Sequence, residues 1–366
     1  MTLSPAPLFT PFKLKNLTLP NRIVMAPMTR SKSPNQVPGE DVAAYYARRA
    51  EGGVGLIITE GVAPDHPVAL SDANVPNFHG DALDGWAKVL AAVKAKGGLI
   101  MPQLWHTGLM RKPGAGPNPH LPSVGPSGLF KPGKKITEPM TSAEIDEVIA
   151  GYATSSRHAE ELGFDGVEVH GAHGYLIDQF FWEGTNERAD DYGGSMVKRS
   201  QFAVEIIRAI RKAVSKDFPV ILRWSQWKQQ DYTIKLAPTP QALEGFLEPI
   251  VKAGVDCIHC STRRFWEPEF EGSDLNLAGW TKKITGLPTI TVGSVGLNQE
   301  FIATYRGEPA TPASLDRLIE MFSRGDFDLV AVGRALIVNP NWVEMVRAGK
   351  FDELQPFTVQ ALPVLH

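Results

Sequence analysis

Two histidines and a tyrosine lie close together in the segment His170-Gly-Ala-His173-Gly-Tyr175. A pair of imidazoles at this spacing can hydrogen-bond one oxygen of a carbonyl or nitro group, which polarises an attached double bond. A tyrosine beside them can supply a proton from its phenol. A metal site would require a third ligand, and the neighbouring sequence offers none. We therefore predict that His170 and His173 bind substrate, that Tyr175 donates a proton, and that the site holds no metal.

Two glycine-containing turns are candidates for binding a phosphate group. Gly293-Ser294 and Gly333-Arg334 each follow a short apolar run. Backbone amides in such turns bind phosphate, and the guanidinium of Arg334 would add charge-assisted hydrogen bonds. The alternative is that these glycines only shape tight turns.

Hydrogen-bond donors dominate the remaining candidates, which include Gln103, Trp105 and Arg223. Arg223 closes an almost wholly apolar run, so its charge requires a buried partner, either an electron-rich ligand or an internal carboxylate. No Ser-His-Asp order, metal-ligand cluster or Schiff-base lysine stands out beside them. An array of donors of this kind suits a large, planar, polar cofactor that carries out the difficult chemistry itself.

The elements that must position these residues are short buried strands alternating with amphipathic helices. Continuous apolar runs are typical of parallel strands, and eight occur in order: Ile23–Ala26, Gly55–Thr59, Leu99–Leu104, Gly166–His170, Val220–Trp224, Asp256–Ser261, Thr289–Gly293 and Leu329–Gly333. Helical patterns between and after them cover Leu83–Lys96, Thr141–Leu162, Lys198–Val214, Gln241–Ala253, Ser314–Ser323 and Asn341–Ala348. This alternation predicts a single (β/α)8 TIM barrel domain over residues 1–366, whose chemistry sits at the carboxyl ends of the strands.

Three stretches fall outside this alternation. Phe9–Pro20 is expected to form a hairpin that plugs the bottom of the barrel. Arg111–Pro139 is rich in glycine and proline, and Phe265–Ala278 is acidic and aromatic. Because long irregular loops in a compact domain are usually functional or disordered, we expect these two to form a lid over the mouth.

Composition limits the classes of partner and the compartment. The chain carries 37 basic and 40 acidic residues, which gives no electrostatic footprint for nucleic acid or an anionic membrane surface. No apolar run reaches the ~18 residues that span a bilayer, and Met1–Asn16 lacks the apolar segment of a signal peptide. The two cysteines, Cys257 and Cys260, cannot form a disulfide framework, and a strand would point them to opposite faces, which argues against a zinc site. We expect a cytoplasmic protein.

Further motifs accompany these residues along nearly the whole chain. They are the opening segment from Pro11 to Arg22, Ala26-Pro-Met-Thr-Arg30, Gln103-Leu-Trp105, Asp178-Gln-Phe180, Thr185-Asn-Glu-Arg188, Asp191-Tyr-Gly-Gly-Ser195 and Val332-Gly-Arg334. Their order and spacing, from about Leu8 to Val346, resemble the Old Yellow Enzyme family of FMN-dependent ene-reductases. One departure is Met196-Val197-Lys198, where family members often carry Glu-Asn before the arginine, which puts a local salt bridge in doubt.

The resemblance implies a role for each matching residue. Pro27, Met28 and Thr29 would lie beside the isoalloxazine, and Gly61 and Gln103 would contact its pyrimidine edge. Arg223 would lie near N1 and O2. The phosphate would be held by Gly293, Ser294, Gly333 and Arg334. His170 and His173 would hold the substrate oxygen, and Trp105 would line the pocket. NADPH or NADH would pass hydride to the flavin, an enone or nitro-alkene would take it at the β-carbon, and Tyr175 would protonate the α-carbon. Whether the protein is a monomer or a dimer stays open.

The sequence has three rival interpretations. Larger relatives with an iron–sulfur cluster require about four cysteine thiolates, and this chain has two. A non-redox barrel acting on a phosphorylated sugar would keep the phosphate turns, but it calls for a catalytic lysine or paired carboxylates at the strand ends. A flavin carrier without turnover would have no use for the proton donor at Tyr175.

Overall fold

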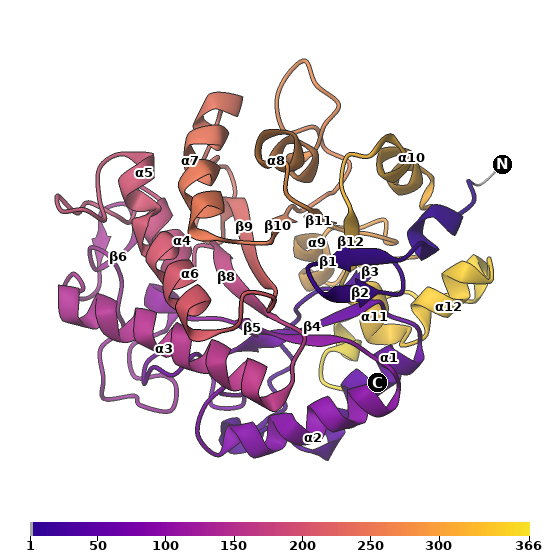
Figure 1. Ribbon diagram of the computed structural model, residues 1–366, viewed down its shortest axis with the longest axis horizontal. Coiled ribbons are helices and arrows are strands. Elements are labelled where there is room, and N and C mark those ends of the chain that lie inside the picture. Colours follow the sequence, from indigo (N-terminus) through magenta and orange to yellow (C-terminus); the bar gives the residue numbers. More distant parts are fainter. Residues whose placement is uncertain (1–2) are drawn as a thin grey trace.

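A closed barrel of eight parallel strands forms the centre of the protein, as seen in the computed structural model, which describes residues 3–366 (Figure 1). In chain order the strands are β3 (Ile23–Met25), β4 (Leu56–Val62), β5 (Ile100–Leu104), β8 (Val167–His173), β9 (Val220–Lys228), β10 (Cys257–Ser261), β11 (Thr289–Val292) and β12 (Leu329–Val332). Each coincides with a predicted apolar run, so the (β/α)8 fold is confirmed. Three strands, β4, β8 and β9, continue past their predicted ends, which places His173 within a strand.

Helices surround the barrel (Figure 1). Those expected from the sequence are α2 (Ala82–Ala95), α3 (Ser142–Leu162), α6 (Gln201–Ala213), α7 (Pro240–Ala253), α10 (Asp316–Arg324) and α12 (Trp342–Arg347). The predicted helix Lys198–Val214 is interrupted at Ser200, which separates α5 (Met196–Arg199) from α6. The helices that the sequence did not predict are α1 (Glu40–Glu51), α4 (Leu176–Phe181), α8 (Leu277–Thr285), α9 (Phe301–Tyr305) and α11 (Arg334–Val338).

Short 3-10 turns complete the chain at Ala6–Phe9, Pro34–Gln36, Gly108–Met110, Phe351–Glu353 and Val359–Ala361. Among residues 3–366, no helix combines the length and the apolar character needed to cross a bilayer.

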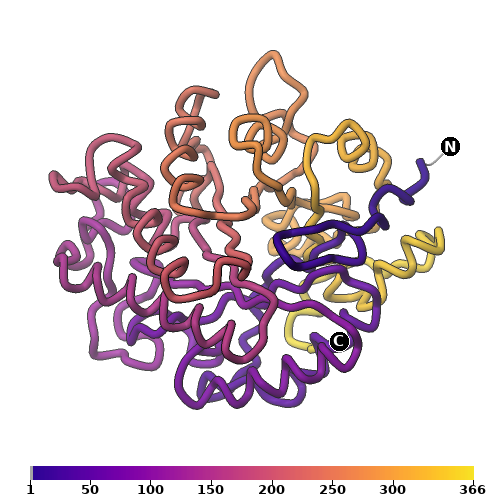
Figure 2. Tube along the Cα trace, viewed as in Figure 1, coloured from indigo at the N-terminus to yellow at the C-terminus, as the bar shows by residue number. Residues whose placement is uncertain are grey.

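The N-terminal hairpin plugs the bottom of the barrel, as expected. Strands β1 (Phe12–Leu14) and β2 (Leu17–Leu19) pair antiparallel, and Figure 2 shows the hairpin lying across the strands. Leu14 and Leu19 pack into the same apolar cluster as the lumen residues of the barrel. Lys15 Nζ lies 2.9 Å from Asp256 Oδ1, immediately before β10, so the hairpin covers the amino ends of the strands. The opposite end is left for the active site.

The two cysteines occupy different layers of the core. Cys257 packs in the lumen of the barrel, whereas Cys260 packs among the residues between the strands and the helices. Both are fully buried, and burial raises the pKa of the Cys257 thiol well above its usual value and that of Cys260 to about 12. The strand therefore points the two thiols to opposite faces, as predicted.

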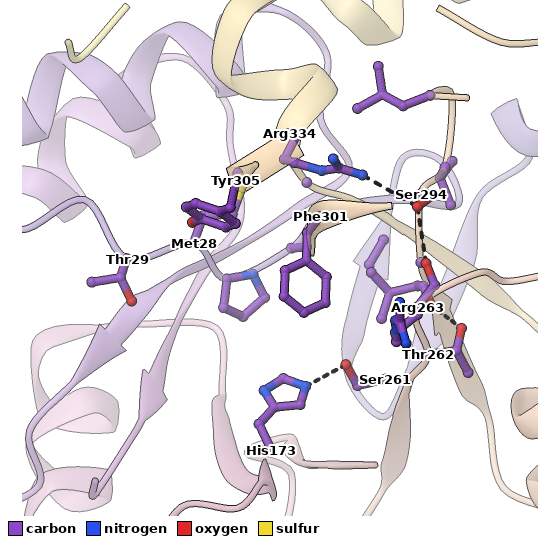
Figure 3. A pocket seen from close by; sticks show the side chains of 18 of the residues that line it. Met28, Thr29, His173, Ser261, Thr262, Arg263, Ser294, Phe301, Tyr305 and Arg334 are labelled. Atoms are coloured by element: carbon purple, nitrogen blue, oxygen red, sulfur yellow. Dashed lines mark hydrogen bonds between the residues drawn. The ribbon is translucent and has the colours of Figure 1, made fainter. Parts of the chain in front are cut away.

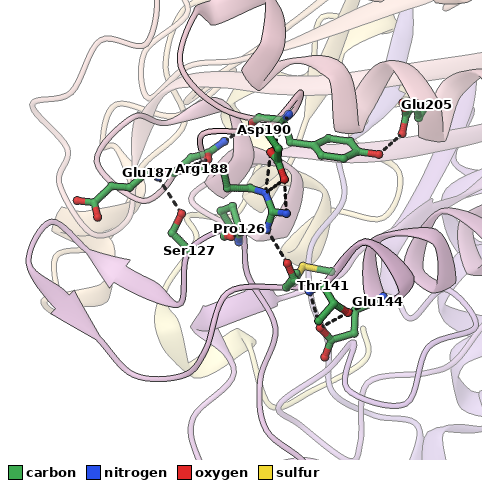
Figure 4. A network of polar contacts seen from close by, with 11 residues as sticks. Pro126, Ser127, Thr141, Glu144, Glu187, Arg188, Asp190 and Glu205 are labelled. Carbon is green, nitrogen blue, oxygen red and sulfur yellow. Dashed lines mark hydrogen bonds and ion pairs between the residues drawn. The ribbon is translucent and has the colours of Figure 1, made fainter.

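One arginine ties the long loop after β5 to the barrel (Figure 4). Arg188 Nη1 donates to the carbonyls of Pro126, at 2.9 Å, and Met140, at 2.6 Å, while its Nη2 meets Asp190 Oδ2 at 2.6 Å. Between these carbonyls the loop forms a small hairpin of β6 (Leu129–Lys131) and β7 (Lys134–Lys135). The Thr185–Arg188 motif thus has a structural role that the sequence did not reveal.

Candidate active site

A cavity of about 550 Å³ opens at the carboxyl ends of the strands (Figure 3). The predicted site residues that line it are Pro27, Met28, Thr29, His173, Arg223, Gly293, Ser294, Gly333 and Arg334. The remaining predicted residues, Gly61, Gln103, Trp105, His170 and Tyr175, lie outside its wall. Neither expected lid loop, 111–139 or 265–278, contributes a side chain to the wall, so their role as a lid stays a prediction.

The two phosphate-type turns come together at one end of this cavity. Ser294 has a left-handed backbone with φ of 55°, and Arg334 Nη2 donates to Ser294 Oγ at 3.3 Å. Gly293 has φ of 141°, and a Cβ there would approach the Thr262 carbonyl oxygen to 2.7 Å, so only glycine fits. Burial lowers the pKa of Arg334 to about 10, which leaves the guanidinium protonated at neutral pH. This end of the cavity therefore presents a fixed positive charge.

The His-His-Tyr group forms a compact aromatic cluster at the end of β8. The ring of His170 lies 5.0 Å from that of His173 and 5.2 Å from that of Tyr175, centroid to centroid. His173 and Gly174 both take positive φ, 66° and 79°, and this turn returns Tyr175 to the histidines. The rings of Trp105 and Tyr175 are nearly perpendicular, with their centroids 4.9 Å apart. A Cβ on Gly61 would lie 2.6 Å from the Trp105 ring, so this glycine makes room for the tryptophan.

Protonation states in this cluster follow from burial. Desolvation, and next the charge of Arg223, lowers the pKa of both His170 and His173 well below the usual value. Burial raises the pKa of Tyr175. At neutral pH both imidazoles are neutral and the phenol keeps its proton. His170 Nδ1 accepts from the Ala172 backbone N–H at 3.2 Å, so its proton lies on Nε2.

A tryptophan that the sequence did not single out supports His173. The rings of Trp227 and His173 stack at 4.5 Å and 20°. Tyr232, Phe301 and Tyr305 continue this aromatic wall along the cavity. Trp227 was missed because the apolar run of β9 stops at Trp224, and the polar residues that follow read as a loop.

A buried ion pair holds the turn that carries His173. Lys228 Nζ meets Asp178 Oδ1 at 2.5 Å, and both side chains are fully buried. The other oxygen, Asp178 Oδ2, accepts from the Gly174 N–H at 2.7 Å. The pair therefore links the start of α4 to the end of β9 across the His173–Gly174 turn. The sequence named Asp178 only as part of a motif, and Lys228 was missed.

Arg223 points into the cavity without a carboxylate partner. Its Nη2 donates to Ser261 Oγ at 3.2 Å, and His173 Nε2 lies 2.7 Å from the same hydroxyl. Within residues 3–366 its buried Nε has no hydrogen-bond partner, and no carboxylate oxygen lies within 4.0 Å of the guanidinium. Arg223 thus does not form an internal salt bridge, which was the alternative to a ligand as its partner. Because Arg223 lines the cavity and carries a charge without a carboxylate partner, it favours an electron-rich ligand at this position.

Comparison with known proteins decides the family. The model of the NADH:flavin oxidoreductase / NADH oxidase family matches residues 7–353. Among solved structures, the old yellow enzyme homologue from Zymomonas mobilis is 25% identical with a TM-score of 0.79, covering 98% of this chain and 96% of that one. This chain belongs to the Old Yellow Enzyme family.

Other members of the family agree over almost the full chain. Morphinone reductase in complex with tetrahydroNAD is 28% identical with a TM-score of 0.80, covering 97% of this chain and 93% of that one. The 12-oxophytodienoate reductase 7 of Oryza sativa subsp. japonica is 32% identical over 364 residues, which are 93% of this chain and 88% of the relative. The NADH oxidase of Thermoanaerobacter brockii is 34% identical over 360 residues, but the chain spans only 52% of its length.

Old Yellow Enzyme proteins use FMN with NADH or NADPH as reductant, and the residues of this cavity fit that cofactor. The Arg223 guanidinium, which lines the cavity without a carboxylate partner, matches an electron-rich ring edge, and the Ser294–Arg334 end matches a phosphate. Gln103 pairs with Gly61 across the β4–β5 ladder and hydrogen-bonds a buried carboxylate, Glu168, at 2.7 Å. The cavity therefore offers groups that fit FMN, namely a positive charge at the Ser294–Arg334 end and hydrogen-bond donors at Arg223.

Proposed function

We propose that this protein reduces activated C=C bonds of α,β-unsaturated carbonyl or nitro compounds with electrons from NADPH or NADH. Bound FMN would supply the hydride-transfer chemistry, from the nicotinamide to the β-carbon of the alkene. The observation that carries the proposal is the cluster of His170, His173 and Tyr175, two neutral imidazoles and a protonated phenol grouped beside a cavity that fits FMN.

The histidines bind the substrate oxygen in this proposal. His170 donates from Nε2, because its Nδ1 is occupied by the Ala172 N–H. His173 is held from both sides, by the Trp227 ring and by the Ser261 hydroxyl. Neutral donors stabilise the negative charge that develops on the carbonyl or nitro oxygen as the β-carbon is reduced.

Tyr175 supplies the proton to the α-carbon. Its raised pKa keeps the proton on the phenol at neutral pH, and the Trp105 edge holds the ring against the histidines. Pro27, Met28 and Thr29 line the cavity at the end of β3 and would contact the flavin ring.

A visible absorption spectrum followed by anaerobic titration tests the proposal. Protein purified with FMN should show flavin bands that bleach on addition of NADPH or NADH and return on addition of 2-cyclohexenone or 1-nitrocyclohexene. A colourless protein that takes up no added FMN would contradict the cofactor assignment. Flavin bands that bleach but do not return with either alkene would contradict the substrate class.

A further inference from the structure

Glu168 places a carboxylate in the lumen of the barrel, beneath the cavity. It lies on β8 and is completely buried. Its Oε1 accepts from Gln103 Nε2 on β5 at 2.7 Å, and its Oε2 accepts from His259 Nδ1 on β10 at 2.6 Å. Burying a carboxylate away from water costs several kcal/mol unless partners compensate the charge. The proposed reaction has so far given this residue no role.

The charge that compensates Glu168 belongs to Arg223. Burial lowers the pKa of Arg223, and the charge of Glu168 is the largest effect that raises it again. Strand β9 lies between β8 and β10. Its Arg223 pairs in register with His170 on β8 and with His259 on β10. Burial lowers the pKa of His259, so its ring is neutral and contributes a hydrogen bond rather than a charge. Glu168 therefore offsets part of the positive field that Arg223 directs into the cavity.

The carboxylate also fixes the orientation of the Gln103 amide. An ionised carboxylate only accepts hydrogen bonds, so Gln103 must turn its NH2 group toward Glu168. This leaves Gln103 Oε1 as the acceptor that the side chain can offer to a ligand, although Gln103 is only 2% exposed and does not line the cavity wall. The pyrimidine edge of an isoalloxazine offers one ring N–H donor between two carbonyl acceptors, which complements an acceptor at Gln103 and a donor at Arg223.

We propose that Glu168 is a positioning residue that acts on bound FMN through Gln103 and Arg223 and lowers the reduction potential of the flavin. The inference rests on the proposed function, since it assumes that the cavity holds FMN. A negative charge near a flavin ring disfavours its electron-rich reduced form. A purely structural Glu168 would affect stability and leave the potential unchanged.

Glu168→Gln tests this directly, because glutamine keeps the size of the side chain and one acceptor oxygen but removes its charge. The midpoint potential of bound FMN is measured by equilibration with a reference dye. We expect a change of at least tenfold in the two-electron equilibrium constant, a shift of ~30 mV to more positive potential. A folded, flavin-loaded E168Q with the wild-type potential would overturn the proposal.

Two further variants keep the test sharp. Asp328→Asn removes a largely buried carboxylate at the opposite, amino end of the barrel, where it pairs with Lys282 at 2.9 Å, and should leave the potential unchanged. Glu168→Asp retains the charge, so its two-electron equilibrium constant should change by much less than tenfold. This variant also tests the proposal if E168Q does not fold. A shift in E168D as large as the tenfold limit would show that charge is not the cause.

The outcome is separable from that of the proposed function. If the wild type binds FMN but reduces neither alkene, the proposed function fails, yet the positive shift in E168Q still supports the role of Glu168. If alkene reduction proceeds and E168Q has the wild-type potential, only the role of Glu168 fails.

Discussion

Neutral imidazoles define the substrate contact at the scale of single residues. Because desolvation and Arg223 lower the pKa of His170 and His173, both rings stay uncharged down to acid pH. They act by donating hydrogen bonds, and they add no charge that would bind anions indiscriminately.

His173→Ala should weaken the binding of phenolic ligands, which place an oxygen where the substrate carbonyl would bind. A lost hydrogen bond to a charged oxygen costs about 1.5–3 kcal/mol, so we expect the dissociation constant to rise about tenfold or more. Titration of the long-wavelength charge-transfer band of the phenol–flavin complex measures it. His158→Ala, at a half-buried site on α3, is the control. Unchanged phenol affinity in H173A would count against the pairing.

Tyr175→Phe should separate the two half-reactions. A positioned general acid contributes roughly a hundredfold or more, so alkene reduction should slow by that order while flavin reduction by NADPH stays near normal. Stopped-flow absorbance of each half-reaction provides the measurement. Tyr192→Phe removes a phenol that hydrogen-bonds Glu205 instead of the histidines and should leave both rates unchanged. An equal loss in both half-reactions of Y175F would exclude the role as proton donor.

Residue types and spacing predicted the aromatic cluster but not what supports it. His170, His173 and Tyr175 stand close in the sequence and meet in space, although their roles stay predictions. Lys228 and Glu168 were missed because a buried charge in a strand is unusual, and its partner lies far away along the chain. Only tertiary structure brings such partners together.

At the scale of elements, the strands that carry the site are longer than their apolar runs. β9 continues through Ser225, Gln226 and Lys228, all buried, after the apolar pattern has ended. These polar side chains are hydrogen-bonded inside the protein. The strand therefore continues although its apolar pattern has ended. Such disagreement between local pattern and structure is expected where a fold carries a functional site. The helix α1 was missed for a related reason, since Tyr45, Tyr46 and Arg49 on its buried face disguise the apolar stripe.

The ion pair between α4 and β9 predicts a compensating pair of substitutions. Lys228→Met leaves Asp178 buried without its cation, which should lower the free energy of unfolding by about 3–5 kcal/mol. Asp178→Asn in the same chain removes the unpaired charge and should restore most of the loss. Urea unfolding followed by circular dichroism measures both.

An exposed pair provides the comparison. Lys252→Met breaks the Lys252–Glu248 pair on the surface of α7 and should change the free energy of unfolding by less than about 1 kcal/mol. If Lys228→Met were no more destabilising than Lys252→Met, the buried pair would not hold the His173 turn.

For the whole molecule, buried neutral histidines make stability depend on pH. Burial lowers the pKa of His66 to about 4, and the pKa values of His106, His170, His173 and His259 also lie below the usual 6.5. The unfolded chain takes up protons on these rings as the pH falls below 6.5, while the folded chain does not. Stability present above pH 6.5 is therefore lost progressively toward pH 4. Glu60, whose pKa burial raises to about 7, opposes part of this trend.

The free energy of unfolding should therefore fall between pH 7 and pH 5, by up to about 1.4 kcal/mol per pH unit for each such histidine. Urea titrations at the two pH values measure the difference. His66→Gln should reduce the dependence, whereas His120→Gln, at an exposed position, should not. A free energy of unfolding that is the same at both pH values would contradict the assignment of neutral buried rings.

The barrel as a whole was the most predictable feature. Eight apolar runs separated by helical patterns admit few closed arrangements, and each run became a strand. The shape of the cavity was not predictable, because its wall includes Phe301 and Tyr305 from a segment without a clear pattern. Where that segment lies depends on contacts such as Arg334 with the Gln299 carbonyl, between parts of the chain far apart in sequence.

The sealed thiols of β10 have a practical use. Since Cys257 and Cys260 are buried and held in the unreactive protonated form, maleimides and other alkylating reagents should leave the native protein unmodified. A cysteine introduced by Tyr305→Cys, at a side chain that is 66% exposed on the rim of the cavity, would then be the single site for a fluorophore. Its emission would report the arrival and departure of nicotinamide and alkene in real time, without any change to His170, His173 or Tyr175.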